Sequence, residues 1–167
     1  MFPLPTMTQN KIEIDLKGKQ FEMSPLVLAD LANMQQWFKE LPLQKCKAEL
    51  KEFGEMYEDK KKRKLVNKAH ETYTERSEVI DGKDIDIDLK KKVKEDMNTE
   101  FCSLDGIGRM LWLSLKKTQP DITLEQVASM IDLDSLVSIR VLLDSLMFAP
   151  KPDSCDEKKT TEGDGEI

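Results

Sequence analysis

Three aspartates and a glutamate have the spacing of a metal-binding loop. Asp84, Asp86 and Asp88 alternate with isoleucines, and Glu95 stands at the twelfth position counted from Asp84. This is the ligand spacing of a calcium-binding EF-hand loop, whose sixth position is a glycine that allows a sharp turn. Leu89 occupies that sixth position here. Acidic residues that alternate with isoleucines suit an extended segment with one acidic side, so we expect no metal site.

A catalytic histidine is not indicated either. His70 is the single histidine of the chain and stands between Lys68 and Glu71. One imidazole cannot supply the usual zinc ligand sets, and no adjacent cysteine or serine could serve as an activated nucleophile. Gly106 and Gly108 lie in an apolar segment, where they favour close helix packing over phosphate binding. We therefore expect no enzyme activity, no cofactor and a solvent-exposed His70.

A second charged motif is the run of five cations at Lys60–Lys64. Such runs can mark a phosphate-binding or targeting patch. On a helix, however, five consecutive side chains point in all directions, and Glu58, Asp59 and Glu71 flank the run. The pattern favours a solvated charged helix, with binding of nucleic acid as the alternative.

Residues 123–146 have the outline of a DNA-binding helix-turn-helix. The position that should hold an apolar residue to lock the second helix is Ser138. The helix that would enter a groove contains Asp134 and Asp144, with Arg140 as its cation. Two packed core helices are the favoured interpretation, and a small helical DNA-binding regulator is the alternative function.

The composition limits the class of protein. The chain has 167 residues, of which 39% are hydrophobic and 35% charged, which excludes a membrane protein and a wholly disordered one. A net charge of −6 makes nucleic acid unlikely as the main partner. Three scattered cysteines favour a reducing compartment. We see neither a signal peptide pattern nor a run near the ~18 apolar residues of a membrane span, so we expect a cytoplasmic protein.

Alternating apolar residues predict that residues 11–23 form a β-hairpin. Ile14 should lie opposite Phe21, and Ile12 opposite Met23, with a glycine in the turn between the strands. A lone hairpin is marginal in water. Its apolar face should therefore lie on a helix.

Helical periodicity follows the hairpin. Ser24-Pro25 is a start signal for a helix whose apolar repeat should end at Pro42. Residues 43–79 predict one or two highly charged helices, with a kink or break at Gly54. A turn and loop should then lead to a short helix at 89–101.

The last third holds most of the apolar residues. Ser103 should cap a helix that is apolar nearly all round, and residues 118–121 should break it. Thr123 and Gln126 have the spacing of a capping box that opens the next helix. We predict a mostly α fold with a flexible N-terminus (1–10), a compact single helical domain that includes the hairpin (11–150), and a disordered acidic and polar tail (151–167).

The final helix is the candidate interface, because it is apolar on more than one face. One face can pack on the helix of Trp112, and a leftover apolar face would bind a second copy of the chain or a client helix. Coverage of that face by the charged helices of 43–79 is the alternative. The predicted partner-binding residues are Leu136, Ile139, Leu143, Met147 and Phe148.

Two segments resemble the tail assembly chaperones of long-tailed bacteriophages. The segment Ile14–Leu31, IDLKGKQFEMSPLVLADL, is similar to that family's short hairpin followed by a Pro-Leu-x-Leu-x-Asp-Leu helix start. Val27 stands where the family often has threonine. The segment Leu111–Val127, LWLSLKKTQPDITLEQV, resembles the family's apolar helix, Pro-Asp-x-Thr turn and capped short helix.

The resemblance implies a non-enzymatic protein of phage morphogenesis. Such chaperones bind the long, aggregation-prone tape measure protein and help to recruit tail tube subunits. They act in the host cytoplasm and are absent from the finished virion. Tape measure and tail tube proteins are therefore the expected partners, alongside self-association.

Overall fold

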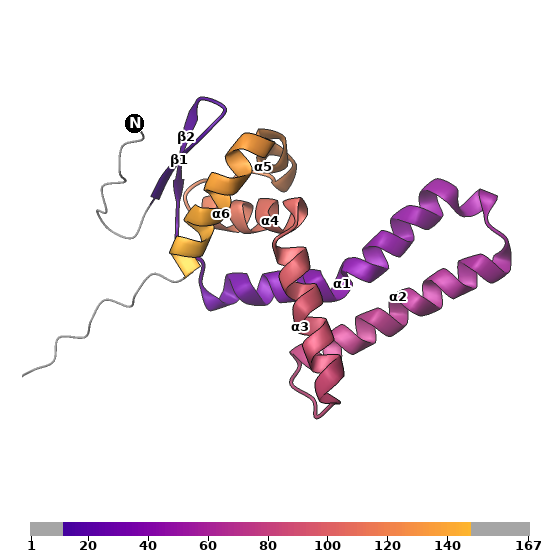
Figure 1. Cartoon of the computed structure of the whole chain (residues 1–167). Coiled ribbons are helices and arrows are strands. Elements are labelled where there is room, and N and C mark those ends of the chain that lie inside the picture. Colours follow the sequence, from indigo (N-terminus) through magenta and orange to yellow (C-terminus); the bar gives the residue numbers. More distant parts are fainter. Residues whose placement is uncertain (1–11, 148–167) are drawn as a thin grey trace, which may run out of the picture.

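The computed structural model describes residues 12–147, and helices make up 74% of that part of the chain (Figure 1). The mostly α fold class and the N-terminal hairpin are confirmed. The predicted flexible N-terminus and polar tail lie outside the described residues. In chain order the elements are β1 (Ile12–Leu16), β2 (Lys19–Met23), α1 (Leu28–Phe53), the 3-10 helix η1 (Gly54–Met56), α2 (Asp59–Ile80), α3 (Ile87–Phe101), α4 (Leu104–Lys116), α5 (Leu124–Met130) and α6 (Leu133–Met147).

The hairpin has the predicted register. Strands β1 and β2 are antiparallel, with Ile14 opposite Phe21 and Ile12 opposite Met23. Gly18 in the turn has a φ of +76°, a conformation that glycine adopts without steric cost. Met23 is fully buried. The apolar face of the hairpin therefore joins the core, as the marginal stability of a lone hairpin requires.

Helix α1 does not end at Pro42, so that prediction is wrong: the helix continues to Phe53. Proline has no N–H, which leaves the carbonyl of Phe38, four residues earlier, without its helical donor. The buried Arg76 of α2 replaces that donor, because its Nη1 donates a hydrogen bond to the Phe38 oxygen over 2.8 Å. Its guanidinium carbon also lies 3.9 Å from the centroid of the Phe38 ring. This contact with α2 therefore allows α1 to continue beyond Pro42 without an unpaired backbone carbonyl at Phe38.

Helices α1 and α2 form an arm that projects away from the rest of the molecule (Figure 1). We use "arm" for the outer half of α1, η1 and the first half of α2. The predicted break at Gly54 is confirmed, since η1 begins there and reverses the chain. The Phe53 and Tyr57 rings lie 6.5 Å apart at this tip, and Lys61 Nζ lies 3.5 Å from the Tyr57 ring centroid.

Helix α4 is the predicted core helix. Its residues are buried on nearly all sides, and Leu111 and Leu115 have no exposed surface. Ser103 caps it by accepting a hydrogen bond from the Gly106 N–H over 3.1 Å. Trp112 is half-buried and donates its Nε1–H to the Ile122 carbonyl over 2.9 Å. This bond ties α4 to the turn that leads into α5.

Capping side chains begin the last two helices. Thr123 and Gln126 form the predicted capping box at the start of α5. Asp132 Oδ1 accepts a hydrogen bond from the Ser135 N–H over 2.7 Å, before α6. Hydrogen bonds from Ser135 hold the pKa of the Asp132 carboxyl below its usual value. Buried side chains of the hairpin, α1, α3, α4, α5 and α6 together form one hydrophobic cluster.

Candidate functional site

The structure divides the predicted interface residues of α6 between core and surface. Ile139 and Leu143 are 0% and 1% exposed and belong to the hydrophobic cluster, so the expectation that they are presented to a partner is wrong. Leu136 is half-buried against the same cluster. The side chain of Met147, and Phe148 as a whole, lie outside the described residues.

The prediction failed because α6 has two apolar faces, and the sequence alone does not show which of them is buried. The face that contains Ile139, Leu143 and Leu146 is buried in the core. Apolar residues repeat on the other face too, so a helical pattern fits either choice. Two of the predicted interface residues, Ile139 and Leu143, therefore lie on the face that the protein uses for its own packing.

A different row of α6 side chains is exposed. Leu133, Val137 and Val141 are 81%, 69% and 58% exposed. They follow one another at intervals of four residues and therefore line one side of the helix. We call these three residues the α6 outer face. In Figure 1 the α1–α2 arm points away from α6, so the charged helices do not cover this face as the alternative proposed.

Charges around the α6 outer face are mixed. Asp134, Arg140 and Asp144 are exposed, and within residues 12–147 no ion pair engages them. Two carboxylates beside one guanidinium make a poor surface for DNA phosphates. The surroundings of the face suit a protein partner better, because its apolar centre has a polar rim.

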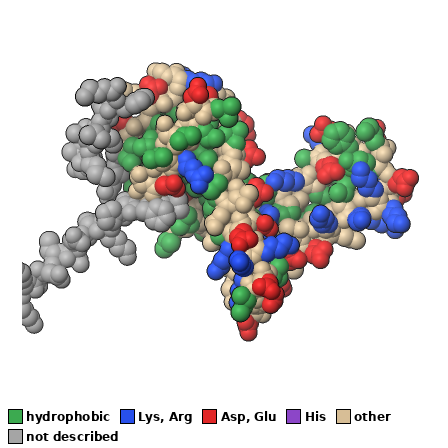
Figure 2. All heavy atoms as spheres, in the orientation of Figure 1, with side chains coloured by type: hydrophobic (Ala, Val, Ile, Leu, Met, Phe, Trp, Pro, Cys, Tyr) green, Lys and Arg blue, Asp and Glu red, His purple; other side chains and the backbone are tan. Residues whose placement is uncertain are grey.

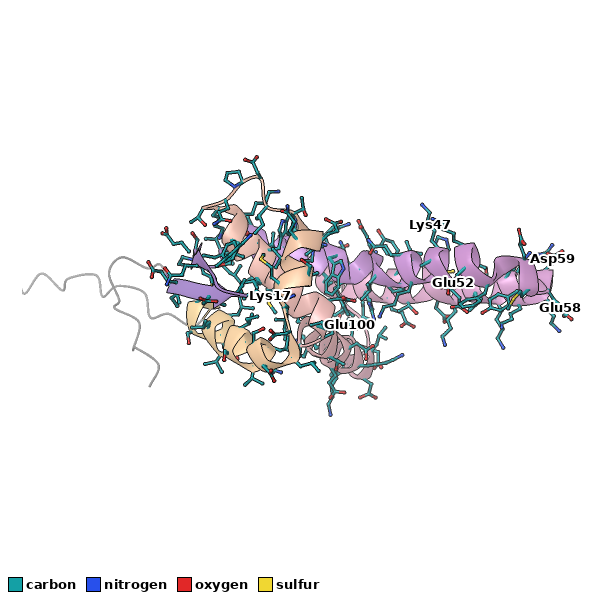
Figure 3. All side chains as sticks on the ribbon, turned by 90° about the horizontal axis from the view of Figure 1, so that it is seen from above. Lys17, Lys47, Glu52, Glu58, Asp59 and Glu100 are labelled. Carbon is teal, nitrogen blue, oxygen red and sulfur yellow. The ribbon has the colours of Figure 1, made fainter. Side chains whose placement is uncertain are left out.

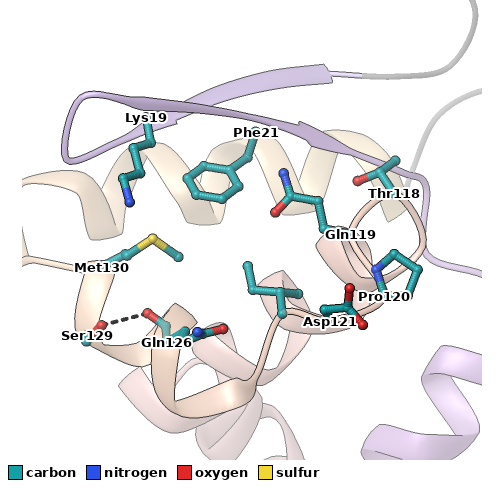
Figure 4. Close-up of a pocket in the computed structure, with 10 residues that line it drawn as sticks. Lys19, Phe21, Thr118, Gln119, Pro120, Asp121, Gln126, Ser129 and Met130 are labelled. Atoms are coloured by element: carbon teal, nitrogen blue, oxygen red, sulfur yellow. Dashed lines mark hydrogen bonds between the residues drawn. The ribbon is translucent and has the colours of Figure 1, made fainter.

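An open hollow of about 720 Å³ lies between β2 and the loop that leads into α5 (Figure 4). Phe21, Ile122 and Met130 supply its apolar surface, and Gln119 and Gln126 supply amides. Its two charged lining residues are Lys19 and Asp121. Its two hydroxyl groups, on Thr118 and Ser129, donate hydrogen bonds to backbone carbonyls rather than to a side chain that could act as a base.

One cluster of aromatic and cationic side chains was not predicted from the sequence. The guanidinium of Arg109 lies 5.8 Å from the ring centroids of both Trp37 and Trp112, and its Nη2 donates to Asn33 Oδ1 over 3.2 Å. Lys116 Nζ lies 4.7 Å from the Trp112 ring on the same helix. Burial lowers the pKa of Arg109, and Glu40 opposes that shift. The cluster fastens α4 to α1, and its sequence signal is the spacing of Arg109, Trp112 and Lys116.

Metal and catalytic chemistry receive no support from the part of the chain that the structure describes. Within it no three His, Cys, Asp or Glu side chains are grouped to hold a metal ion. Asp84 and Asp86 lie before α3, whereas Asp88 belongs to it. His70 is exposed on α2, as predicted.

Comparisons with protein-family models, with curated proteins and with solved structures give no match. Among the described helices, none combines the length and the apolar character needed to cross a membrane. The α6 outer face is the candidate site, because its three apolar side chains are exposed in one row.

Proposed function

We propose that this protein is a non-enzymatic chaperone of phage tail assembly, which uses the α6 outer face to bind a helical segment of the tape measure protein. The observation that carries the proposal is the exposure of Leu133, Val137 and Val141 in one row on a helix whose opposite side is core. An apolar row at intervals of four residues fits the apolar stripe of an amphipathic helix.

The arrangement of the chain supports the family named from the two segments. The first segment covers the hairpin and the start of α1, and the second runs from α4 into α5. Both segments contribute to one core, because Met23 and Val127 belong to the same hydrophobic cluster. The proposed roles in the host cytoplasm, in recruiting tail tube subunits and outside the finished virion follow from that family.

The size of the α6 outer face fits a reversible contact. Complete burial of one fully exposed valine or leucine side chain is worth roughly 1.5–3 kcal/mol, so the surface that these three still expose gives about 3–6 kcal/mol before any cost. Lost translational and rotational freedom costs at least about 4 kcal/mol. A weak contact of this kind holds a client during assembly and then releases it. Many such contacts along a long client would add through avidity.

The proposal is tested by affinity capture from the host during phage production. Tagged wild-type protein should recover the tape measure protein, and the variant Val137→Asp with Val141→Asp should not. The matched control is Met56→Asp with Ile87→Asp, which places the same charges on side chains that are 76% and 78% exposed elsewhere. The control should recover the client as the wild type does.

Three outcomes would count against the proposal. Equal recovery by both variants would remove the α6 outer face from the contact. Recovery of the chain alone, as an oligomer that Val137→Asp and Val141→Asp dissociate, would assign the face to self-association. Recovery of DNA that Arg140→Gln abolishes would favour the regulator that uses residues 123–146.

A further inference from the structure

Two of the five cations at Lys60–Lys64 have partners within the chain, and the remaining ones lie on one side of α2. Lys61 lies over the Tyr57 ring, and Lys62 pairs with Asp59 at 3.8 Å. The other cations of this stretch are exposed on the side of α2 opposite Ala69, which is buried. We call this side the α2 outer face; its cations are Lys60, Arg63, Lys64 and Lys68.

These four cations are available to a ligand. No ion pair joins any of them to a carboxylate within residues 12–147. Glu71 and Glu75 share the face, and Glu58 and Asp59 lie at the end of the arm (Figure 3). Four positive groups against two carboxylates on the face leave it cationic, and Figure 2 shows Lys and Arg side chains along the arm.

The acidic charge of the rest of the chain does not cancel this patch. Sixteen residues separate Lys64 from Ile80 at the base of α2, which is about 24 Å at 1.5 Å per residue. The Debye length at physiological salt is about 8 Å. Charges at the base of α2 are therefore screened at the α2 outer face, and residues 45–68 themselves hold nine Lys and Arg against five Asp and Glu.

We propose that the α2 outer face binds the phosphate backbone of double-stranded DNA without regard to sequence. Lys60, Lys64 and Lys68 follow one another at about 6 Å along the helix, close to twice the 3.4 Å by which successive phosphates of one strand rise along the duplex axis. The face holds no apolar anchor of the kind that protein partners need. It holds no aromatic side chain on which single-stranded bases stack. This site is separate from α6 and does not rest on the proposed chaperone function.

The test is the salt dependence of binding to a fluorescent 30-base-pair duplex, measured by anisotropy with the full-length protein. Four phosphate contacts predict that log K falls with log salt at a slope of about −3.6, which is about 150-fold between 50 and 200 mM salt. Two duplexes of unrelated sequence should bind equally. Lys64→Gln with Lys68→Gln should reduce the slope to about −1.8.

The matched control is Lys91→Gln with Lys94→Gln, which removes two exposed cations from α3 and changes the net charge equally. This control should keep the wild-type slope. Absence of binding at 50 mM salt, or equal weakening by both double variants, would overturn the proposal. Displacement of the duplex by polyglutamate at an equal concentration of charge would also overturn it, because the face would then bind acidic protein. The Lys64→Gln and Lys68→Gln variant should still bind the tape measure protein, so loss of DNA binding can be distinguished from loss of the proposed chaperone function.

Discussion

The contact between Arg76 and the Phe38 carbonyl predicts that Arg76→Met destabilises the protein more when Pro42 is present than when residue 42 is alanine. The carbonyl has no helical donor, since Pro42 lacks an N–H, and Arg76 Nη1 supplies one over 2.8 Å. A hydrogen bond from a charged group is worth about 1.5–3 kcal/mol. The guanidinium over the Phe38 ring adds about 1 kcal/mol. Burial lowers the pKa of Arg76, although Glu100 and Asp96 act in the opposite direction. Burial of the charged guanidinium therefore costs free energy, and replacement by methionine removes that cost and offsets part of the loss.

These terms give a net loss of about 2–3 kcal/mol for Arg76→Met. In a Pro42→Ala background the alanine N–H can bond to the Phe38 oxygen, so the loss should fall to about 1 kcal/mol. The double-mutant cycle therefore predicts a coupling of about 1–2 kcal/mol. Urea unfolding of the four proteins, followed by far-ultraviolet circular dichroism, measures it.

Arg109→Met is the matched control, because Arg109 also lies over aromatic rings but donates to Asn33 rather than to α1 backbone. Its effect should be the same with Pro42 and with alanine. Additivity of Arg76→Met and Pro42→Ala within about 0.5 kcal/mol would refute the account of how α1 passes its proline.

Three further substitutions test the packing and the caps. Gly106→Ala places a Cβ 2.2 Å from the Glu100 carbonyl oxygen and should lower the free energy of unfolding in urea by at least about 1–3 kcal/mol. Gly108→Ala places a Cβ 3.5 Å from its nearest atom, Ile131 Cδ1, and should be neutral or stabilising. Leu143→Asp should abolish cooperative thermal unfolding, because that side chain is 1% exposed. Asp132→Ala should lose stability near neutral pH, since the pKa of Asp132 is lowered on folding. The difference from wild type in urea unfolding is complete above the unfolded pKa of about 3.9 and should disappear as the pH falls through the lower folded value.

Local signals in the sequence predicted the elements that depend on neighbouring residues. The hairpin register follows from alternation about a glycine, and the capping box of Thr123 and Gln126 from two residues three apart. The core helix after Ser103 follows from apolar residues on all its sides. In each case the physical cause lies within a few residues of the element, so the local sequence pattern is enough to predict that element.

The sequence failed where the cause lies in a distant element. Pro42 is a helix breaker by local rules, and Arg76, which donates to the carbonyl that Pro42 leaves without a helical donor, belongs to another helix. Both faces of α6 are apolar, so periodicity could not reveal that Ile139 is core and Val137 is surface. The α2 outer face emerges only after Tyr57 and Asp59 are seen to engage two of the five cations.

Co-expression with a tape measure protein, the client that we propose, tests the central claim most directly. The fraction of tape measure protein that stays in the supernatant after centrifugation is measured beside wild type, Val137→Asp with Val141→Asp, and the Met56→Asp with Ile87→Asp control. We predict that the wild type and the control keep the client in solution and that the α6 variant, although folded, does not. A tape measure protein that precipitates equally in all three, or stays in solution equally in all three, would contradict the assignment of chaperone function to the α6 outer face.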